Sequence, residues 1–188
     1  MKIKIFIMLF VTVLLAQSSV WALMSASAHM ANFSGSSGTK SGYGAELSLP
    51  LLPLTLGASY LDHTFLSLPS FTGFSGGNMT GAIIPIYATF KFGVPLIPIF
   101  AAVEGGYTLA TAAAGSATLA IPGGFYYAVN GGYSFSPIPA LSIWAEAGYS
   151  FLVLDLRAAI TSAGGSPGSI QNVDYSGASW KAGLTIGL

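Results

Sequence analysis

Apolar residues and small or polar residues alternate along most of the chain after residue 22. Residues 141–151 read LSIWAEAGYSF, residues 99–109 read IFAAVEGGYTL, and residues 178–188 read ASWKAGLTIGL. In each stretch one alternate set is apolar or aromatic, and the other contains most of the Gly, Ser, Thr, Glu and Lys. A period of two is that of a β-strand whose two faces meet different surroundings. The pattern therefore predicts an all-β protein.

Proline pairs and glycine-rich segments divide this pattern into strands. Pro50 and Pro53, Pro95 and Pro98, and Pro137 and Pro139 mark three short turns, because proline cannot donate a ladder hydrogen bond. Segments with many small residues at 66–80, 110–124 and 158–174 are predicted to be longer loops. A further loop is predicted at 34–39. Pro85 lies inside a predicted strand, where we expect a β-bulge. The predicted strands are 23–33, 41–49, 54–64, 81–92, 98–109, 124–136, 140–156 and 176–188.

Short turns at one end and longer loops at the other are typical of a transmembrane barrel. The prediction is an eight-stranded antiparallel transmembrane β-barrel with an up-and-down meander. The strand at 23–33 has the weakest pattern, and it is included because bacterial single-chain barrels have even strand numbers. Spanning helices are the alternative, with windows at 82–103 and 137–156. Both windows contain prolines and charged residues such as Lys91, Glu146 and Asp155, which disfavour them.

The N-terminus has the three-part plan of a secretory signal peptide. Lys2 and Lys4 precede an apolar run over 5–16, and Val20-Trp21-Ala22 supplies small residues around a cleavage site. A second candidate site is Ala26-Ser27-Ala28, and an uncleaved anchor is the other alternative. The apolar run is short against the roughly 20 residues of a spanning helix. The predicted organisation is a signal peptide at 1–22 and a barrel domain at 23–188, with no separate periplasmic domain.

Composition agrees with a chain that lipid surrounds. Only 6% of its 188 residues are charged and 53% are hydrophobic, and a soluble protein of this kind would expose large apolar patches. The formal net charge of zero gives no reason to expect a nucleic-acid partner. A soluble barrel remains the alternative, but its exposed face would be polar. Eleven aromatic residues are instead predicted to face lipid: Tyr43, Tyr60, Phe90, Phe92, Tyr107, Tyr127, Tyr133, Phe135, Tyr149, Phe151 and Trp180.

The opposite face carries most of the remaining charge, so we expect it to line the lumen. An eight-stranded barrel has an interior that side chains just fill. The predicted lumenal polar cluster contains Glu46, Glu104, Glu146, Lys91, Lys181, His29, Asn130 and Tyr126, with Tyr87 and Trp144 beside them. Its three acids exceed its two lysines, and a protonated Glu, a protonated His29 or a bound cation could balance the difference. The cluster is interpreted as an inert plug, and a gate or polar path for a small solute is the alternative.

Candidate catalytic chemistry is sparse. His63 follows Asp62 and lies close in sequence to Ser59 and Thr64, and His29 lies near Ser25 and Ser27. A His–Ser–carboxylate set requires spatial contact that sequence does not establish. Asp155, Arg157 and Asp174 are expected on a solvated rim. Two histidines and no cysteine give no pattern for a metal site, so no catalytic residue, metal or cofactor is predicted.

With these features placed, residues 23–188 resemble the small eight-stranded outer-membrane barrels of the OmpA, OmpX and OmpW type. The similarity lies in the overall pattern and in repeated GGY and AGY segments at 105–107, 131–133 and 147–149. It implies a bacterial outer-membrane location, contact with membrane lipid and lipopolysaccharide, insertion by the barrel-assembly machinery, and a monomer. The terminal Leu188 departs from the aromatic residue that usually ends this family.

The resemblance also ranks the functional hypotheses. A structural or surface-interaction protein comes first, with Gly/Ser/Thr-rich loops expected to face outside; barrel folds host many functions, so this ranking rests on analogy. A minor channel for small or apolar solutes is the second hypothesis. A lipid A-modifying enzyme centred on His63 is the third, and the expectation is that the protein is not an enzyme.

Overall fold

The computed structural model describes residues 24–49, 53–68, 77–93, 97–114, 117–138, 140–162, 166 and 172–187. The predicted signal peptide and the terminal Leu188 lie outside the described residues. The elements in chain order are β1 (Ser25–Gly35), β2 (Gly38–Leu49), β3 (Leu54–Leu68), β4 (Gly77–Gly93), β5 (Ile99–Ala114), β6 (Ala117–Ile121), β7 (Phe125–Ile138), β8 (Leu141–Leu154), α2 (Leu156–Ser162), β9 (Val173–Asp174) and β10 (Gly177–Gly187).

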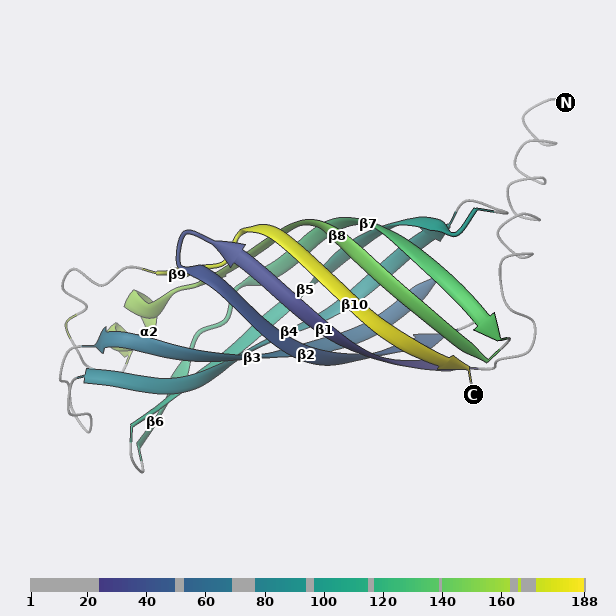
Figure 1. The fold of residues 1–188 in the computed structure, drawn as a ribbon. Helices are drawn as coiled ribbons and strands as arrows, with labels where there is room; N and C mark the ends of the chain where they lie inside the picture. The colour runs from purple at the N-terminus through teal and green to yellow at the C-terminus, as the bar shows by residue number, and fades with distance from the viewer. Residues whose placement is uncertain are drawn as a thin grey trace, which may run out of the picture.

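Eight of these strands close into an antiparallel barrel (Figure 1). In the order β1, β2, β3, β4, β5, β7, β8, β10, each strand pairs with the one that follows it. β10 also pairs with β1, from Ser25↔Gly187 to Phe33↔Ser179, and this pairing closes the ring. A path that starts at Ser25 and passes from each residue to its partner on the next strand returns to β1 near Gly35 and not at Ser25. This stagger means that the strands are tilted relative to the barrel axis. The predicted eight-stranded fold is therefore confirmed, including its first strand.

The two faces of the barrel differ as the alternation predicts. Every one of the eleven aromatic residues expected on the lipid face is exposed, with Tyr43 at 65% and Phe135 at 53%. Aliphatic residues such as Val129, Ile143 and Leu184 are exposed between them. The buried residues come from the alternate positions of the same strands. The outer surface is therefore apolar, and the lumen carries the polar groups.

The two ends of the barrel are unequal (Figure 1). At one end, here called the terminal end, lie the start of β1 and the end of β10, together with the ends of β2, β4 and β7 and the starts of β3, β5 and β8. The predicted turn residues Pro50, Pro95 and Pro139 lie outside the described residues. At the opposite end, the loop end, lie β6, α2 and β9, together with the long outer ends of β3 and β4. No helix in the described part of the chain is long and apolar enough to cross a membrane.

The loop end contains more regular structure than the sequence predicted. β3 and β4 run into the predicted loop at 66–80, and β6 pairs with the outer part of β5 inside the predicted loop at 110–124. The predicted loop at 158–174 contains most of α2 and all of β9. The first hairpin is tight: Ser36 and Ser37 form its turn, and Gly38 follows with a φ of 100°. Continued strand pairing satisfies backbone groups that a loop would leave to water.

The bulge expected at Pro85 is wrong. The register between β3 and β4 is the same on both sides of it, from Ala58↔Ile86 to Leu61↔Ile83, and only the pairing between them is interrupted. Pairing with β5 continues through Pro85↔Thr108. Pro85 has no backbone N–H to donate, and β4 accommodates it by losing its pairing with β3 at this point while keeping its pairing with β5. The register instead shifts between Phe65 and Leu68, and between Phe135 and Ile138 at the end of β7.

Candidate functional site

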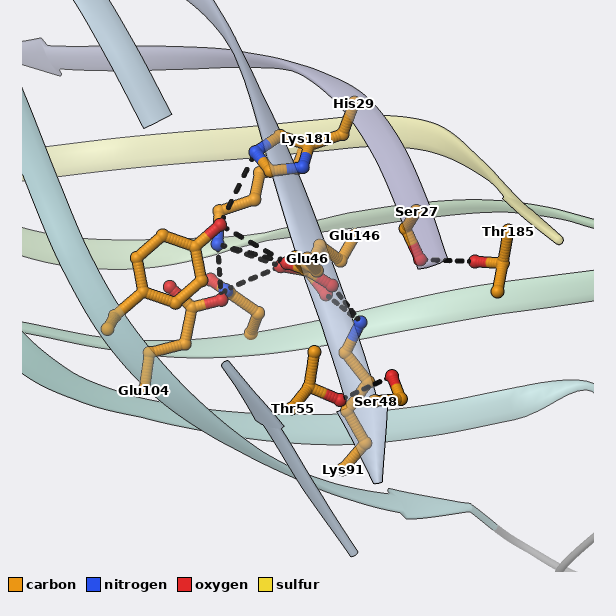
Figure 2. A network of polar contacts seen from close by, with 12 residues as sticks. Ser27, His29, Glu46, Ser48, Thr55, Lys91, Glu104, Glu146, Lys181 and Thr185 are labelled. Atoms are coloured by element: carbon orange, nitrogen blue, oxygen red, sulfur yellow. Dashed lines mark hydrogen bonds and ion pairs between the residues drawn. The ribbon is translucent and has the colours of Figure 1, made fainter. Parts of the chain in front are cut away.

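Five charged side chains meet inside the barrel and form the lumenal charge cluster: Glu46, Lys91, Glu104, Glu146 and Lys181. They come from β2, β4, β5, β8 and β10, so residues far apart in sequence converge on the barrel axis (Figure 2). Each occupies an inward position of its strand, which the period-two pattern dictates. Four of them are buried, and Lys91 is half-buried. The alternation therefore places nearly all of this charge away from the apolar outer face.

Lys181 lies at the centre of the cluster. Its ammonium nitrogen is 2.5 Å from Glu104, 3.6 Å from Glu146 and 3.9 Å from Glu46. The same nitrogen lies 3.9 Å from the centre of the Tyr87 ring. A buried ammonium requires this kind of surrounding because desolvation of an unpaired charge is costly. One lysine thus holds three carboxylates together.

Lys91 closes the cluster toward the terminal end. Its ammonium nitrogen is 3.1 Å from Glu46 and 3.9 Å from Glu146. It also lies 4.3 Å from the centre of the Trp144 ring and 5.5 Å from that of Phe100. Its side chain is 28% exposed, whereas the Glu46 and Glu146 side chains are 1% and 0% exposed. Solvent therefore reaches the cluster at Lys91.

Neutral side chains complete the hydrogen bonding of the carboxylates. The Tyr126 hydroxyl donates to Glu104 at 2.6 Å, and the Tyr87 hydroxyl donates to Glu46 at 3.2 Å. The Asn130 amide nitrogen donates to Glu104 at 3.4 Å and to Glu146 at 3.2 Å. His29 Nε2 lies 3.3 Å from the Tyr87 hydroxyl. The structure thus brings together all eight residues of the predicted cluster, and Tyr87 links His29 to the acids.

Glycines on the inner face give the large lumenal rings their space. A Cβ added at Gly57 would lie 2.6 Å from the Tyr87 ring, and one at Gly132 would lie 2.3 Å from the Phe100 ring. One at Gly183 would lie 3.0 Å from Trp144. Side chains at these positions would collide with the Tyr87, Phe100 and Trp144 rings, so the glycines make room for them. The lumen is filled to the point where one methyl group matters.

Several buried polar atoms have no hydrogen-bond partner among the described residues. They are His29 Nδ1, Thr89 Oγ1, Thr108 Oγ1, Asn130 Oδ1, Trp144 Nε1, Glu146 Oε2 and Ser150 Oγ. An unpaired buried polar atom loses its hydration without replacement. No group of three or more His, Cys, Asp or Glu disposed to hold a metal ion occurs in the described part of the chain.

Apolar side chains fill the lumen between the charge cluster and the loop end. This apolar plug consists of buried residues on the strands and in the folded loop: Phe33, Leu61, Ile83, Leu152, Leu154, Leu156, Ile160 and Val173. α2 packs against β6, and Asp155 caps α2 by accepting from the Ala158 N–H at 3.0 Å. The plug was not predicted from the sequence, although the alternation continues through residues 110, 112, 119 and 121, which belong to the same buried cluster.

His63 belongs to the loop end and not to a group with Ser59. The Tyr175 hydroxyl lies 2.8 Å from His63 Nδ1, and both side chains are buried. Ser59 shares a hydrogen bond of 3.0 Å with His29 Nε2, while Asp62 points outward and is exposed. The sequence proximity of His63, Asp62 and Ser59 therefore does not become one catalytic arrangement. Tyr175 was absent from the sequence-based candidates.

Asp174 fastens the last loop to the first hairpin. Its carboxylate accepts from the Ser36 hydroxyl at 3.3 Å and from the Ser176 N–H at 2.7 Å. Its backbone N–H donates to the Ser37 hydroxyl, and its carbonyl accepts from the Ser37 N–H. The backbone hydrogen bond from Ser176 lowers the pKa of the Asp174 carboxyl. Asp155 and Arg157 are exposed, as expected for a solvated rim, and Asp174 is half-buried. Asp174 also clasps the last loop to the first hairpin.

The fold is similar to that of solved barrel structures. Neisserial surface protein A (NspA) aligns with a TM-score of 0.50 and 15% identity, over 88% of this chain and 96% of that one. The N-terminal β-barrel domain of Pseudomonas aeruginosa OprF aligns with a TM-score of 0.45 and 10% identity, over 88% of this chain and 96% of that one. Ail of Yersinia pestis, solved in complex with the heparin analogue sucrose octasulfate, aligns with a TM-score of 0.42 and 12% identity, over 87% of this chain and 95% of that one.

These similarities concern structure and not sequence. No protein-family profile matches the chain, and no curated protein matches it in sequence. The similarity to NspA, together with the closed ring of eight antiparallel strands, identifies the architecture. The chain has the fold of the small eight-stranded outer-membrane β-barrel proteins.

Proposed function

We propose that the chain is an outer-membrane β-barrel protein with a structural or surface-interaction role and a lumen closed by packed side chains. The observation that carries the proposal is the distribution of polarity. The exposed face is aromatic and aliphatic, while the lumenal charge cluster is enclosed. Lipid is the solvent that favours such an apolar surface. Closure of the barrel also pairs the backbone groups of the edge strands, which a spanning structure requires.

The location follows from the same reasoning. Residues 1–22 are proposed to direct export, and the loop end is proposed to face the cell exterior. Cleavage after Ala22 would leave β1 intact, whereas cleavage after Ala28 would remove Ser25–Ala28, which pair with both β2 and β10. The outer face would contact membrane lipid and lipopolysaccharide, and the assembly machinery would insert the barrel as a monomer.

The apolar plug favours a closed lumen over a channel. A solute crossing the barrel would have to pass Phe33, Leu61 and Leu152, all of which are fully buried. A non-enzymatic role is proposed on the geometry of His63, since Tyr175 occupies its Nδ1 and Ser59 is engaged with His29. The exposed loop end, held by the Asp174 clasp, is the surface available for interaction.

Two measurements test this proposal. Purified protein should migrate faster on a denaturing gel before boiling than after it, with a β-type circular dichroism spectrum. In planar bilayers it should show little conductance, and the double variant Leu61→Ala/Leu152→Ala should conduct more. The matched control Leu47→Ala/Leu56→Ala changes two exposed leucines and should behave as the unaltered protein. High conductance of the unaltered protein would favour the channel hypothesis instead.

A further inference from the structure

The lumenal charge cluster contains three carboxylates but two ammonium groups. Four of the five side chains are at most 4% exposed, so water screens their charges poorly. A cluster in which every group is ionised would hold one uncompensated negative charge inside the barrel. Such a charge is costly unless a further positive charge accompanies it.

The three carboxylates are not equally well compensated. Glu104 has Lys181 at 2.5 Å, Tyr126 at 2.6 Å and Asn130 at 3.4 Å. Glu46 has Lys91 at 3.1 Å and Tyr87 at 3.2 Å. The uncompensated charge therefore belongs to neither of these two groups.

Glu146 is the weakly compensated carboxylate. Its nearest ammonium groups are Lys181 at 3.6 Å and Lys91 at 3.9 Å, beyond hydrogen-bonding distance. Asn130 donates to its Oε1, and its Oε2 has no hydrogen-bond partner among the described residues. The uncompensated charge of the cluster therefore lies at Glu146.

Two further buried oxygen atoms, one beside Glu146 and one beside Glu104 in the ladder, are also unpaired. Asn130 is 5% exposed, reaches into the cluster through its amide nitrogen, and leaves its Oδ1 without a partner among the described residues. Thr89, which pairs across the ladder with Glu104, is 0% exposed, and its hydroxyl oxygen is likewise unpartnered there. Carboxylate, amide and hydroxyl oxygens are ligands that hard cations accept.

We propose that the lumenal charge cluster binds one additional positive charge at Glu146, delivered as a monovalent cation or as a proton. The charge enters from the terminal end past the half-exposed Lys91, because the apolar plug closes the opposite side. This inference rests on the proposed function in one respect, the closure of the lumen at the loop end. Its readout is nevertheless independent of membrane location and of conductance.

Other charged and titratable groups surround Glu146, and the experiment must distinguish their effects from that of Glu146. They are Lys181 on β10, Lys91 and Tyr87 on β4, Glu46 on β2, Glu104 on β5, Tyr126 on β7 and His29 on β1. His29 is the other group able to take up a proton near neutral pH. A variant at His29 is therefore needed beside the variant at Glu146.

The experiment measures the unfolding temperature of the full chain, purified in zwitterionic detergent. At pH 8 and constant ionic strength, Na⁺ or K⁺ is exchanged for N-methylglucammonium, which is too large for the packed lumen. A bound cation should make the unfolding temperature rise with Na⁺ or K⁺ concentration. A bound proton should leave it independent of the cation but make it fall as the pH rises from about 5 to 8.

Glu146→Gln keeps the shape of the side chain and an acceptor for Asn130, and it should abolish either dependence. Asp62→Asn removes an exposed carboxylate outside the lumen and should retain the dependence of the unaltered protein. The proposal is overturned if the unfolding temperatures of the unaltered protein and of Glu146→Gln respond in the same way to both the cation and the pH. It is also overturned if the dependence persists in Glu146→Gln and disappears in His29→Asn. An unshifted gel band in the unaltered protein would contradict the barrel itself, a distinct failure.

Discussion

The Tyr175 hydroxyl lies 2.8 Å from Nδ1 of His63, across 112 residues of sequence. The two rings meet edge to face, with centroids 5.7 Å apart. The contact joins the segment that follows β9 to β3. The last loop is therefore held at two places, one inside the barrel and one at its rim.

Removing the Tyr175 contact should loosen the loop end without unfolding the barrel. Tyr175→Phe loses one hydrogen bond and should reduce the free energy of unfolding by about 1 kcal/mol. Tyr175→Ala also leaves a cavity and should cost roughly 3–5 kcal/mol. Urea unfolding in detergent measures both changes. Equal stability of the two variants would show that the ring is not packed at this position.

High pH should act on the same contact. Burial raises the pKa of Tyr175 to about 12, above the ordinary value of 10.0. A group whose pKa is raised on folding stabilises the folded state below its unfolded value, so this contribution should disappear as the pH rises from 10 to 12. Ultraviolet absorbance of tyrosinate would follow the titration. Tyr175→Phe should remove this late step, and titration curves of the two proteins that coincide above about pH 11 would contradict the burial of Tyr175.

Neutralising Lys181 should destabilise the barrel strongly. Lys181→Met leaves Glu104 buried beside an apolar group, which should cost about 3–5 kcal/mol. The double variant Lys181→Met/Glu104→Gln should recover part of this loss, because no charge then remains unpaired at that contact. A double-mutant cycle from urea unfolding gives the coupling. Strictly additive effects of the two substitutions would show that the ion pair is not a structural unit.

Adjacent glycines on opposite faces provide a matched pair of variants. Gly132→Ala places a methyl group against the Phe100 ring and should cost roughly 1–3 kcal/mol. Gly131→Ala faces outward, where nothing lies within 4 Å of the added Cβ, and should be nearly neutral. The temperature at which the fast-migrating gel band disappears reports both. A reversal of this order would place the two residues on the wrong faces.

Two tryptophans should report the two surroundings by fluorescence. Trp180 is 43% exposed on the outer face, and Trp144 is 4% exposed in the lumen. In refolded residues 23–188, bromine-labelled lipid should quench Trp144→Phe, which retains Trp180. The variant Trp180→Phe, which retains Trp144, should be quenched far less. Strong quenching of both variants would mean that Trp144 also reaches lipid.

The alternation of the sequence predicted the strands, the outward aromatic residues and the charge of the lumen, since each depends only on the period of a strand. It could not predict which lysine meets which carboxylate, because that pairing depends on the stagger with which β10 closes onto β1. Glu46, Glu104 and Glu146 lie on three different strands, and only closure brings them to Lys181.

The apolar plug was missed for a related reason. Residues 156–162 are too short a segment to carry a clear helical period, and α2 forms where packing against β6 and the Asp155 cap support it. The bulge expected at Pro85 failed because a strand can interrupt its pairing on one side without changing register. These features depend on tertiary contacts, which local patterns do not encode.

The pairing of β1 with β10 makes the barrel a ring in which no strand is structurally first. Ser25 lies opposite Gly187, so a short linker could join the two ends without crossing the lumen. The chain could then be opened at Ser36 and Ser37, the turn of the first hairpin, and every ladder of the barrel would be retained. Such a circular permutant should adopt the same ring, because the geometry depends on which strands are neighbours and not on the order in which they are synthesised.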